Sequence, residues 1–255
     1  GRGPLDALRA DPVVRAAHDT AVETGATVYI AGGALRNMAL GVPPAPDYDF
    51  IIRADSRAFS EAVAAALKGA CFLLDKEAPS YRVAVKSGYG AYTVDFSPVR
   101  DEGVVYDLCR RDFTVNALAI DLSEVFGEGD PLIIDPCKGL EDAGEKLLRM
   151  TSKGVFDDDP LRCLRAIRIA LQYGLKIEGE TLALIKLKSG LIRNVSIERV
   201  RDELVAIFSS NGTPLALRAL LKTGVMGVIL PEVARWGDVE GYNLFEHALK
   251  TVEEY

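Results

Sequence analysis

The amino-acid sequence predicts an α+β fold in which a mixed head precedes an all-helical region. Up to about residue 140, short β-type runs alternate with stretches of helical periodicity. After about residue 141 the β-type runs disappear, and glycines break up the helical stretches that follow. We therefore expect a head over residues 1–140, a helical segment over 141–208 and the beginning of another over 209–255, which we expect to be truncated.

Local patterns predict the individual elements. Apolar runs indicate strands, helical periodicity indicates helices, and two alternating runs around a glycine turn indicate a hairpin. In chain order the head contains a strand at 27–32, a helix at 33–40 closed by Gly41, a strand at 48–54, a helix at 56–69 capped by Ser56, a hairpin at 80–99 turning near 87–90, and a strand at 131–136. The helical region is expected to break at Gly174, Gly190, Gly212 and Gly237.

The composition is that of an ordinary globular protein. The chain has 255 residues, of which 49% are hydrophobic and 26% charged, so it can bury a core. No apolar run approaches the ~20 residues of a membrane span, and the N-terminus lacks a signal-peptide pattern. The scattered cysteines form no CxxC pair and are expected to be reduced, mostly buried thiols of a cytoplasmic protein: Cys71, Cys109, Cys137 and Cys163.

Charge and histidine content exclude some classes of function. The net charge of −7 argues against a generally basic nucleic-acid coat, although a local basic groove is compatible with it. The two histidines, His18 and His247, are too few for a histidine-rich metal site and offer few candidates for the histidine of a serine–histidine triad.

Gly32 and Gly33 stand where the first predicted strand runs into a helix. Such a junction presents free backbone N–H groups and the positive end of the helix dipole, which suit a phosphate. Arg36, one turn further, would add a charge-assisted hydrogen bond. A purely structural turn is the alternative, because the segment is neither a Rossmann fingerprint nor a P-loop.

Asp47 and Asp49 are separated by one aromatic residue at the start of a predicted strand. Alternation places both carboxylates on one face and the apolar Tyr48 and Phe50 on the other. Two like charges this close favour a cation between them, and Mg²⁺ prefers carboxylate and phosphate oxygens. We therefore predict a magnesium site at Asp47 and Asp49; the alternative is that they only flank a loop.

Asp95 lies on the polar face of the second hairpin strand, since Val94 and Phe96 alternate with it. Beside the strand that carries Asp49, it would complete a three-carboxylate cluster. Polymerases use paired metals to stabilise the attacking and leaving oxygens together. A solvent-facing Asp95 fits the pattern equally well.

Residues 158–171 predict an amphipathic helix with Asp159 as N-cap and Pro160 in the first turn. Leu164 and Ile167 belong to its apolar stripe. Three arginines recur at every third position beside that stripe: Arg162, Arg165 and Arg168. Taken alone, this is a capped helix with a solvated basic edge.

Five motifs occur in order over about residues 28–208: GGALR from Gly32, DYD from Asp47, RRDFTVNALA from Arg110, DDPLRCLRAIRIA from Asp158 and ERVRDEL from Glu198. Together they resemble the bacterial and eukaryotic class of tRNA nucleotidyltransferases and the bacterial poly(A) polymerases of the same superfamily. The resemblance implies a polymerase-β-type nucleotidyltransferase head, a helical neck with a base-reading helix over 141–208, and the start of a helical body over 209–255.

The resemblance also implies roles for individual residues. The implied metal ligands are Asp47 and Asp49, the third catalytic carboxylate is Asp95, and the nucleotide-binding residues are Gly32, Gly33, Arg36, Arg111, Asp112, Asn116, Asp159, Arg162, Arg165 and Arg168. The RRD motif is associated with ribose recognition, whereas the pattern alone favours Asp112 as a helix cap with Asn116 facing inward. Asp159 and Arg162 would read the base edges of cytosine or adenine and disfavour uracil and guanine.

Two positions depart from the family pattern. Asn37 stands where members usually carry an aspartate, so Arg36 lacks an anionic neighbour, although an amide oxygen can still accept its hydrogen bond. Asp158 replaces the usual glutamate at the start of the base-reading motif, which alters a supporting contact. Residues 243–255 resemble the beginning of an HD-type region, but no His-Asp pair follows, so His247 is interpreted as an ordinary helix residue.

The implied activity is addition of C or A, or both, from CTP and ATP to the 3′ end of tRNA or another RNA, with Mg²⁺ as cofactor. The choice among CCA-, CC-, A- and poly(A)-adding activity stays open at this stage, as does the oligomeric state. A non-catalytic nucleotide- or RNA-binding regulator on the same scaffold is the alternative from another class. An acidic nuclease would use the same carboxylate pair but would need no triphosphate cradle.

Overall fold

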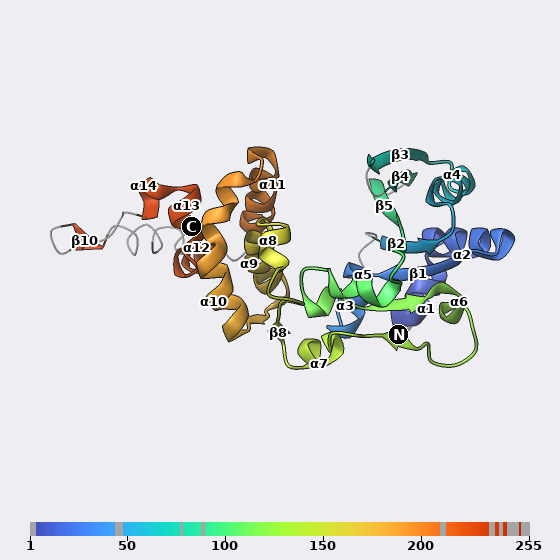
Figure 1. Ribbon diagram of the computed structural model, residues 1–255, viewed down its shortest axis with the longest axis horizontal. Coiled ribbons are helices and arrows are strands. Elements are labelled where there is room, and N and C mark those ends of the chain that lie inside the picture. The colour runs from blue at the N-terminus through green and yellow to red at the C-terminus, as the bar shows by residue number, and fades with distance from the viewer. Residues whose placement is uncertain are drawn as a thin grey trace. The chain divides into compact units, whose positions relative to one another are not determined.

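The computed structural model describes residues 4–43, 48–76, 79–87, 90–209, 213–234, 238–239, 242–243 and 250. The chain divides into two compact units, residues 1–144 and 145–255, which are treated separately below. The first contains the large sheet, and the second is mostly helical (Figure 1). The predicted α+β class with a helical remainder is confirmed, while the further division at residue 208 stays a prediction.

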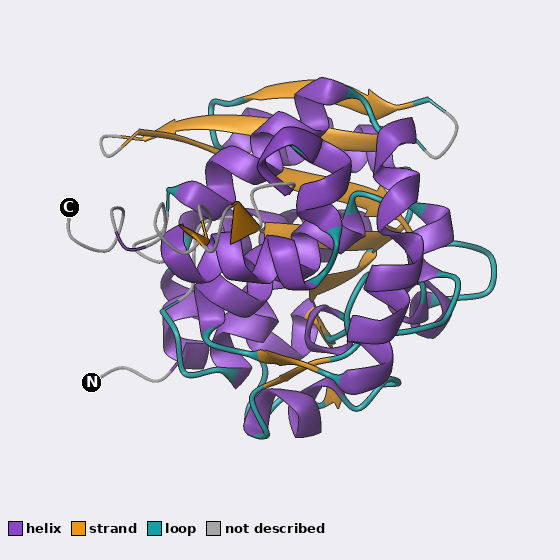
Figure 2. Ribbon diagram, turned by 90° about the vertical axis from the view of Figure 1, so that its left-hand side faces the viewer, coloured by secondary structure: helices purple, strands orange, loops and turns teal. Residues whose placement is uncertain are grey.

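A seven-stranded mixed sheet forms the frame of the first unit, in the order β3-β4-β5-β2-β1-β6-β7. β2 and β5 are parallel, and the other neighbouring pairs are antiparallel. Figure 2 shows these strands as orange ribbons. They are β1 (Thr27–Ala31), β2 (Tyr48–Arg53), β3 (Ala70–Asp75), β4 (Ser80–Ser87), β5 (Gly90–Pro98), β6 (Ala119–Asp121) and β7 (Ile133–Ile134).

The main core of this unit lies on one face of the sheet. Tyr48, Phe50 and Ile52 are buried there with residues of the helices that cover this face, which confirms the predicted alternation along β2. The helices of the unit are α1 (Pro4–Ala10), α2 (Pro12–Thr24), α3 (Gly33–Ala39), α4 (Ser56–Ala66), α5 (Val104–Cys109), η1 (Thr114–Asn116), α6 (Leu122–Val125) and α7 (Gly139–Gly144). Of these, α1, α2, α3, α4 and α6 contribute buried residues to the core.

The helix α2 was not predicted, although its sequence contains clear end signals. Asp11 caps it by accepting hydrogen bonds from the N–H groups of Val13 and Val14. Gly25 ends it with a left-handed conformation at φ +68°. The second carboxylate oxygen of Asp11 accepts a 2.8 Å hydrogen bond from the Tyr48 hydroxyl, which fastens α2 to β2.

Most of the predicted elements of the head are present, with differences at their ends. The hairpin is confirmed as β4 and β5, with Ser87 paired to Gly90 at its turn. The predicted cap of α4 is wrong: Asp55 accepts from the backbone of the first turn, while the Ser56 hydroxyl donates to the carbonyl of Pro79. Asp55, one position before Ser56, accepts hydrogen bonds from the N–H groups of Arg57 and Ala58 and is therefore the N-cap.

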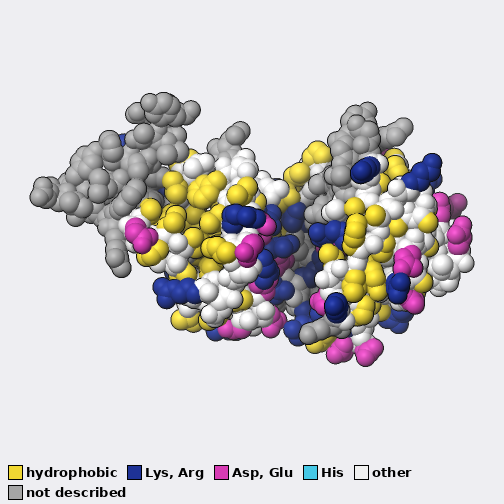
Figure 3. Space-filling view, turned by 90° about the horizontal axis from the view of Figure 1, so that it is seen from above, with side chains coloured by type: hydrophobic (Ala, Val, Ile, Leu, Met, Phe, Trp, Pro, Cys, Tyr) yellow, Lys and Arg dark blue, Asp and Glu magenta, His cyan; other side chains and the backbone are white. Residues whose placement is uncertain are grey.

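The opposite face of the sheet is only partly covered. A small cluster that includes Ala31, Ile51 and Leu108 packs α5 against β1, β2 and β6. Towards the other end of the sheet, the edge strand β3 was also not predicted. It exposes Phe72 and Leu74, and Figure 3 shows hydrophobic surface along this part of the first unit.

The second unit consists mainly of packed helices, with α9 packed against α11 and α12. Its helices are α8 (Val155–Asp158), α9 (Arg162–Tyr173), α10 (Gly179–Lys188), η2 (Ser189–Asn194), α11 (Ile197–Phe208), α12 (Thr213–Lys222), α13 (Val225–Ile229) and α14 (Pro231–Ala234). The expectation of no strands here is wrong, since two-residue pairs form between β8 (Leu147–Leu148) and β9 (Lys176–Ile177) and between β10 (Asp238–Val239) and β11 (Tyr242–Asn243). Runs of two residues are too short to give a periodic signal.

The predicted helix breaks have mixed outcomes. Gly174 ends α9 in a left-handed conformation at φ +63°, as predicted. At Gly190 the chain continues as the 3₁₀ segment η2, so that break is only a change of helix type. Gly212 and Gly237 lie outside the described residues.

The four cysteines are free thiols, as predicted. Only Cys163 is buried, and burial raises its pKa to about 12, whereas the other three are half-buried, contrary to expectation. Across the described part of the chain, no helix is both long and apolar enough to cross a membrane.

Candidate active site

Asp49 and Asp95 lie side by side on the open face of the sheet. The parallel ladder of β2 and β5 pairs their Cα positions directly, and the residues that flank each of them in sequence point into the opposite core. The predicted neighbourhood of these two carboxylates is therefore present in the fold. Asp47, the other predicted metal ligand, lies outside the described residues, as does His247.

The backbone at Gly32 lies very close to the side chains of Asp49 and Arg111. It follows β1 with φ +73° and donates its N–H to the carbonyl of Leu118 at 3.2 Å. A Cβ at this position would lie 2.5 Å from Asp49 Oδ2 and closer still to Arg111 Nη1. Only glycine therefore lets the backbone reach both the acidic and the basic group.

Arg111 bridges the glycine turn and the carboxylate. Its Nη1 donates to Asp49 Oδ2 at 3.1 Å, and the two side chains are partly exposed. The family resemblance associates the motif of Arg111 with ribose recognition, and the structure brings Arg111 to Asp49. The guanidinium of Arg111 therefore lies directly beside the carboxylate of Asp49.

The guanidinium of Arg36 is held in a buried polar network. Nη1 donates to Asn116 Oδ1 at 2.8 Å, and Nη2 donates to Asn37 Oδ1 at 3.2 Å. The amide of Asn116 in turn donates to Asp112 Oδ1 at 2.8 Å. Asn37 thus accepts the hydrogen bond from Arg36 that was expected of it in place of an aspartate.

Asn116 faces inward, as the pattern of its segment suggested, but Asp112 is not a helix cap. The 3₁₀ helix η1 begins after Phe113 without a side-chain cap. Asp112 accepts from the N–H of Phe113 and from Asn116 instead, because a three-residue helix leaves few N–H groups to cap. Its carboxylate therefore orients Asn116, which orients Arg36.

The segment at residues 135–142, which was not assigned a role from the sequence, packs against η1. Thr114 Oγ1 donates to Asp142 Oδ2 at 2.6 Å, and a Cβ on Gly139 would collide with the Thr114 carbonyl. Asp135 accepts from the N–H groups of Gly139 and Leu140, which fixes the start of α7. The signal in the sequence was an aspartate followed four residues later by glycine, typical of a capped turn.

Asp95 has a partner that the sequence analysis missed. Arg82, its neighbour on β4, donates to both carboxylate oxygens at 2.7 Å. Within the described residues, no group of three or more His, Cys, Asp or Glu side chains is close enough to hold a metal ion. The described part of the predicted three-carboxylate cluster consists of Asp49 and Asp95.

In the second unit, Asp159 precedes α9 but is not its N-cap. The helix begins at Arg162, because the residues before it form turns with hydrogen bonds between positions three apart. The N–H of Arg162 donates to the Asp159 carbonyl, and the N–H of Cys163 donates to the Pro160 carbonyl. The Asp159 side chain still accepts from the N–H of Leu161 at 3.2 Å. Its other oxygen accepts from Arg199 Nη2 at 2.8 Å.

The three predicted arginines of α9 differ in their surroundings. Arg162 Nη1 donates to the Val155 carbonyl, and Arg165 is exposed. Arg168 Nε donates to Glu203 Oε2 at 2.6 Å, which ties α9 to α11. Arg199 and Glu203, both from the ERVRDEL motif, are therefore the supporting residues of this helix that the sequence analysis left unassigned.

These features define the class of protein. A mixed sheet with paired aspartates on its open face and a glycine turn against one of them is the head of a polymerase-β-type nucleotidyltransferase. Two family models match the chain: "Poly A polymerase head domain" over residues 28–149 and "Probable RNA and SrmB- binding site of polymerase A" over residues 174–236. The chain belongs to the family of poly(A) polymerases and tRNA nucleotidyltransferases.

Curated relatives and solved structures agree with this assignment. The chain is 37% identical over 204 residues to the CC-adding tRNA nucleotidyltransferase of Geobacter sulfurreducens, covering 80% of this chain and 45% of the relative. It is 34% identical to the A-adding tRNA nucleotidyltransferase of Deinococcus radiodurans, covering 88% and 51%. The Thermotoga maritima CCA-adding enzyme complexed with tRNA superposes with a TM-score of 0.77 at 28% identity, covering 91% and 56%. The chain thus spans about half the length of these proteins.

Proposed function

We propose that this chain adds C or A, or both, from CTP and ATP to the 3′ end of tRNA. The observation that carries the proposal is the pairing of Asp49 with Asp95 beside the Gly32 turn. Relatives that are CC-adding and A-adding enzymes support the reaction type, and a similar fold complexed with tRNA supports the substrate.

The residues present fit a divalent cation of the magnesium type. Asp49 and Asp95 offer carboxylate oxygens, the donors that Mg²⁺ prefers, on one face of two adjacent strands. The backbone at Gly32 comes close to Asp49 without a side chain to fill the space. Asp49 and Asp47 would hold the ion, which when bound lowers the pKa of the attacking hydroxyl and offsets charge on the phosphate oxygens.

The protein's own groups would orient the reactants. Gly32, Gly33 and Arg36 would hold the triphosphate, with Arg36 fixed in advance by Asn116. The 3′-hydroxyl oxygen of the RNA then bonds to the α-phosphorus, the bond from that phosphorus to the bridging oxygen breaks, and pyrophosphate leaves. The hydroxyl proton passes to water.

Base choice would be made by the start of α9. Asp159 can accept from an exocyclic amine, and Arg162 can donate to a ring nitrogen or carbonyl. The contact of Asp159 with Arg199 leaves the carboxylate further lone pairs for this role. Arg165 and Arg168 follow Arg162 on α9, and we retain them as predicted nucleotide-binding residues.

The experiment is incubation of the full-length protein with tRNA lacking CCA and with single labelled nucleotides. CC-addition gives incorporation from CTP alone, and A-addition gives incorporation of A only onto a C-C end. Long A-tracts on any RNA would instead assign a poly(A) polymerase. Nucleotide binding without incorporation would assign a non-catalytic regulator and contradict the proposal.

A matched pair of substitutions tests the carboxylate. Asp49→Asn removes one charge from the proposed metal site and should abolish incorporation while leaving the fold intact. Asp19→Asn removes an exposed charge on α2 and should leave incorporation unchanged. Equal activity of the two variants would remove the metal proposal.

We also propose a cytoplasmic location. The four cysteines are free, and Cys109 and Cys137, whose sulfur atoms are 3.5 Å apart, are both thiols. Free thiols at such a distance are typical of a reducing compartment. Alkylation of intact cells followed by mass spectrometry would test whether both remain reduced.

A further inference from the structure

Cys109 and Cys137 bring two free thiols into contact in the first unit, and the proposed reaction uses neither of them. Cys109 is the last residue of α5, and Cys137 lies in the loop between β7 and α7, 28 positions further along the chain. Their sulfur atoms are 3.5 Å apart, and the Cys137 thiol donates to Cys109 Sγ. A disulfide needs an S–S distance of about 2.05 Å, so the two sulfurs would have to approach by only about 1.5 Å.

The other two cysteines are placed where they cannot compete for this contact. Cys71 lies on β3, at one edge of the seven-stranded sheet, whereas Cys137 follows β7 at the opposite edge. Cys163 belongs to α9 of the second unit, and its side chain is fully buried. The fold therefore selects Cys109 and Cys137 as the pair of thiols that can react with each other.

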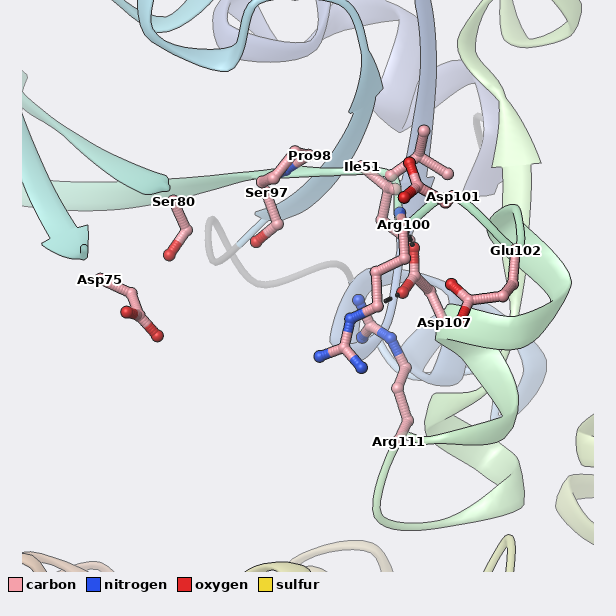
Figure 4. Close-up of a pocket in the computed structure, with 11 residues that line it drawn as sticks. Ile51, Asp75, Ser80, Ser97, Pro98, Arg100, Asp101, Glu102, Asp107 and Arg111 are labelled. Atoms are coloured by element: carbon pink, nitrogen blue, oxygen red, sulfur yellow. Dashed lines mark hydrogen bonds and ion pairs between the residues drawn. The ribbon is translucent and has the colours of Figure 1, made fainter. Parts of the chain in front are cut away.

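Both thiols of this pair lie where a small oxidant can reach them. Each side chain is only half-buried. Cys137 packs at the rim of the small cluster on the open face of the sheet, to which Leu108 of α5 belongs. Asp107 and Arg111, two residues before and after Cys109, line a pocket (Figure 4). Hydrogen peroxide, a molecule little larger than water, can therefore approach the end of α5.

We propose that peroxide converts Cys109 and Cys137 into a reversible disulfide. The thiolate of Cys109 attacks one oxygen of hydrogen peroxide, the O–O bond breaks, and the released hydroxide takes up the Cys109 proton as water, which leaves a sulfenic acid on Cys109. The sulfur of Cys137 then attacks the Cys109 sulfur, the S–O bond breaks, and the hydroxide leaves with the Cys137 proton as a second water. Two thiols thus lose two electrons, and one peroxide is reduced to two waters.

The surroundings of Cys137 suit the second step. Burial and the hydrogen bond to Cys109 raise the pKa of Cys137 to about 12, so this thiol keeps its proton near neutral pH. A protonated thiol does not react first with peroxide, because the thiolate is the nucleophile. It does hold the proton that the leaving hydroxide needs when the disulfide closes.

Closing the disulfide would move the Cys109 side of the pair, because the loop that carries Cys137 is held in place. Asp135 accepts a 2.7 Å hydrogen bond from the N–H of Gly139. Gly139 itself lies so close to the Thr114 carbonyl that a Cβ would collide with it. The approach of the two sulfurs therefore falls mainly on Cys109, at the end of the six-residue helix α5.

Arg111 connects this bond to the proposed active site. Its N–H donates to the Leu108 carbonyl at 3.1 Å, which ties Arg111 to the last turn of α5. Its Nη1 lies 3.1 Å from Asp49 Oδ2, so a shift of the end of α5 disturbs that contact. We expect kcat for incorporation to fall about tenfold in the oxidised protein, as for the loss of one hydrogen bond between charged groups, and this consequence rests on the proposed function.

Mass spectrometry of the full-length protein tests the disulfide without reference to activity. The protein is treated with hydrogen peroxide, its remaining thiols are alkylated with iodoacetamide, and it is digested without reductant. We expect a linked pair of peptides that contains Cys109 and Cys137, is lighter by two hydrogen atoms than the separate peptides, and disappears with dithiothreitol. Cys109→Ser and Cys137→Ser should each abolish the linked pair, whereas Cys71→Ser should leave it unchanged.

Steady-state kinetics test the connection to Arg111. The kcat of the unsubstituted protein should fall about tenfold after peroxide and recover with dithiothreitol, while Cys137→Ser should keep its kcat through the same treatment. Separate alkylated peptides for Cys109 and Cys137 after peroxide would overturn the disulfide. A linked pair with an unchanged kcat would overturn the effect on Arg111. Absence of incorporation by the reduced protein would overturn the proposed function, and the linked peptides would still decide whether the disulfide forms.

Discussion

Arg82 and Asp95 face each other on β4 and β5 and form a bidentate ion pair with both N–O distances at 2.7 Å. Both oxygens of the predicted third carboxylate therefore have a protein donor. The pair is partly exposed, with 43% of the Arg82 side chain accessible, so solvent screening reduces its strength. Arg82 is thus placed to position Asp95 and to compete with a cation for it.

The first prediction concerns this competition. Arg82→Met keeps the apolar stem but removes the competing charge, so the magnesium concentration at half-maximal activity should fall. A screened pair of about 1 kcal/mol corresponds to about fivefold. Magnesium titration of incorporation measures the shift. Arg57→Met, which breaks an exposed pair on α4, should leave the titration curve where it is, and an unmoved curve for Arg82→Met would show that Asp95 takes no part.

The second prediction concerns the glycine turn. Gly32→Ala places a Cβ 2.5 Å from Asp49 Oδ2, so Asp49 and Arg111 must both move. A misplacement of about 1 Å at a catalytic group costs on the order of 100-fold in rate, and incorporation should fall by about that factor. The measurement is kcat for CTP with a saturating tRNA lacking CCA.

Gly25 provides a matched control for this substitution. It has φ +68°, close to the φ of +73° at Gly32, but a Cβ there meets no atom within 4 Å. Gly25→Ala should therefore cost about 1 kcal/mol of stability, as expected for the left-handed conformation of Gly25, without affecting kcat. Equal losses of activity in the two variants would mean that backbone strain alone explains the effect.

Local pattern was enough to predict the elements that carry the site, but not their partners. Alternation along residues 48–52 correctly separated the face of Asp49 from the core face, because the side chains of a strand alternate strictly. Gly32 was recognised as a turn residue for the same local reason. The pairing of β2 with β5 was only one of two interpretations that the pattern around Asp95 left open, since strand order is not encoded in periodicity.

Contacts between distant segments were the ones missed. Arg82 meets Asp95 only because β4 and β5 adopt one register, and Arg199 meets Asp159 across helices of the second unit. The two-residue strands and the edge strand β3 carry too little pattern to be recognised. Helix ends were uncertain where two polar residues adjoin, as Asp55 and Ser56 do.

The third prediction concerns the support of the base-reading residues. Arg199 holds Asp159 at 2.8 Å, and Arg199→Met removes that donor. The Asp159 carboxylate then becomes less precisely oriented, so discrimination against UTP and GTP should weaken by about tenfold, the value of one charge-assisted hydrogen bond. The ratio of kcat/KM for CTP to that for UTP measures the change.

Arg201 is the matched control for Arg199. It lies two residues further along α11 and pairs with Asp202 on the surface, where both side chains are exposed. Arg201→Met should leave nucleotide discrimination unchanged. If Arg201→Met weakened discrimination as much as Arg199→Met, a general loosening of α11 would explain both results.

The fourth prediction is a pH dependence of stability at the start of α10. Burial alone would raise the pKa of Glu178, but hydrogen bonds from the N–H groups of Glu180 and Thr181 and from the Thr181 hydroxyl outweigh it and lower the pKa. A lowered pKa in the folded state means that the stabilisation is present above the unfolded value of about 4.3. It is lost as the pH falls through the lower, folded value.

Urea unfolding of Glu178→Gln and of the unsubstituted protein between pH 7 and pH 3 tests this sign. The variant should be less stable at pH 7 by about 1 kcal/mol, as for a lost helix cap, and the difference should shrink as the pH falls. Glu180 lies on the same helix as this cap and forms an exposed pair with Lys153. Glu180→Gln should therefore show a much smaller difference at every pH. A gap between Glu178→Gln and the unsubstituted protein that widened towards pH 3 would contradict the assignment of Glu178 as an ionised cap.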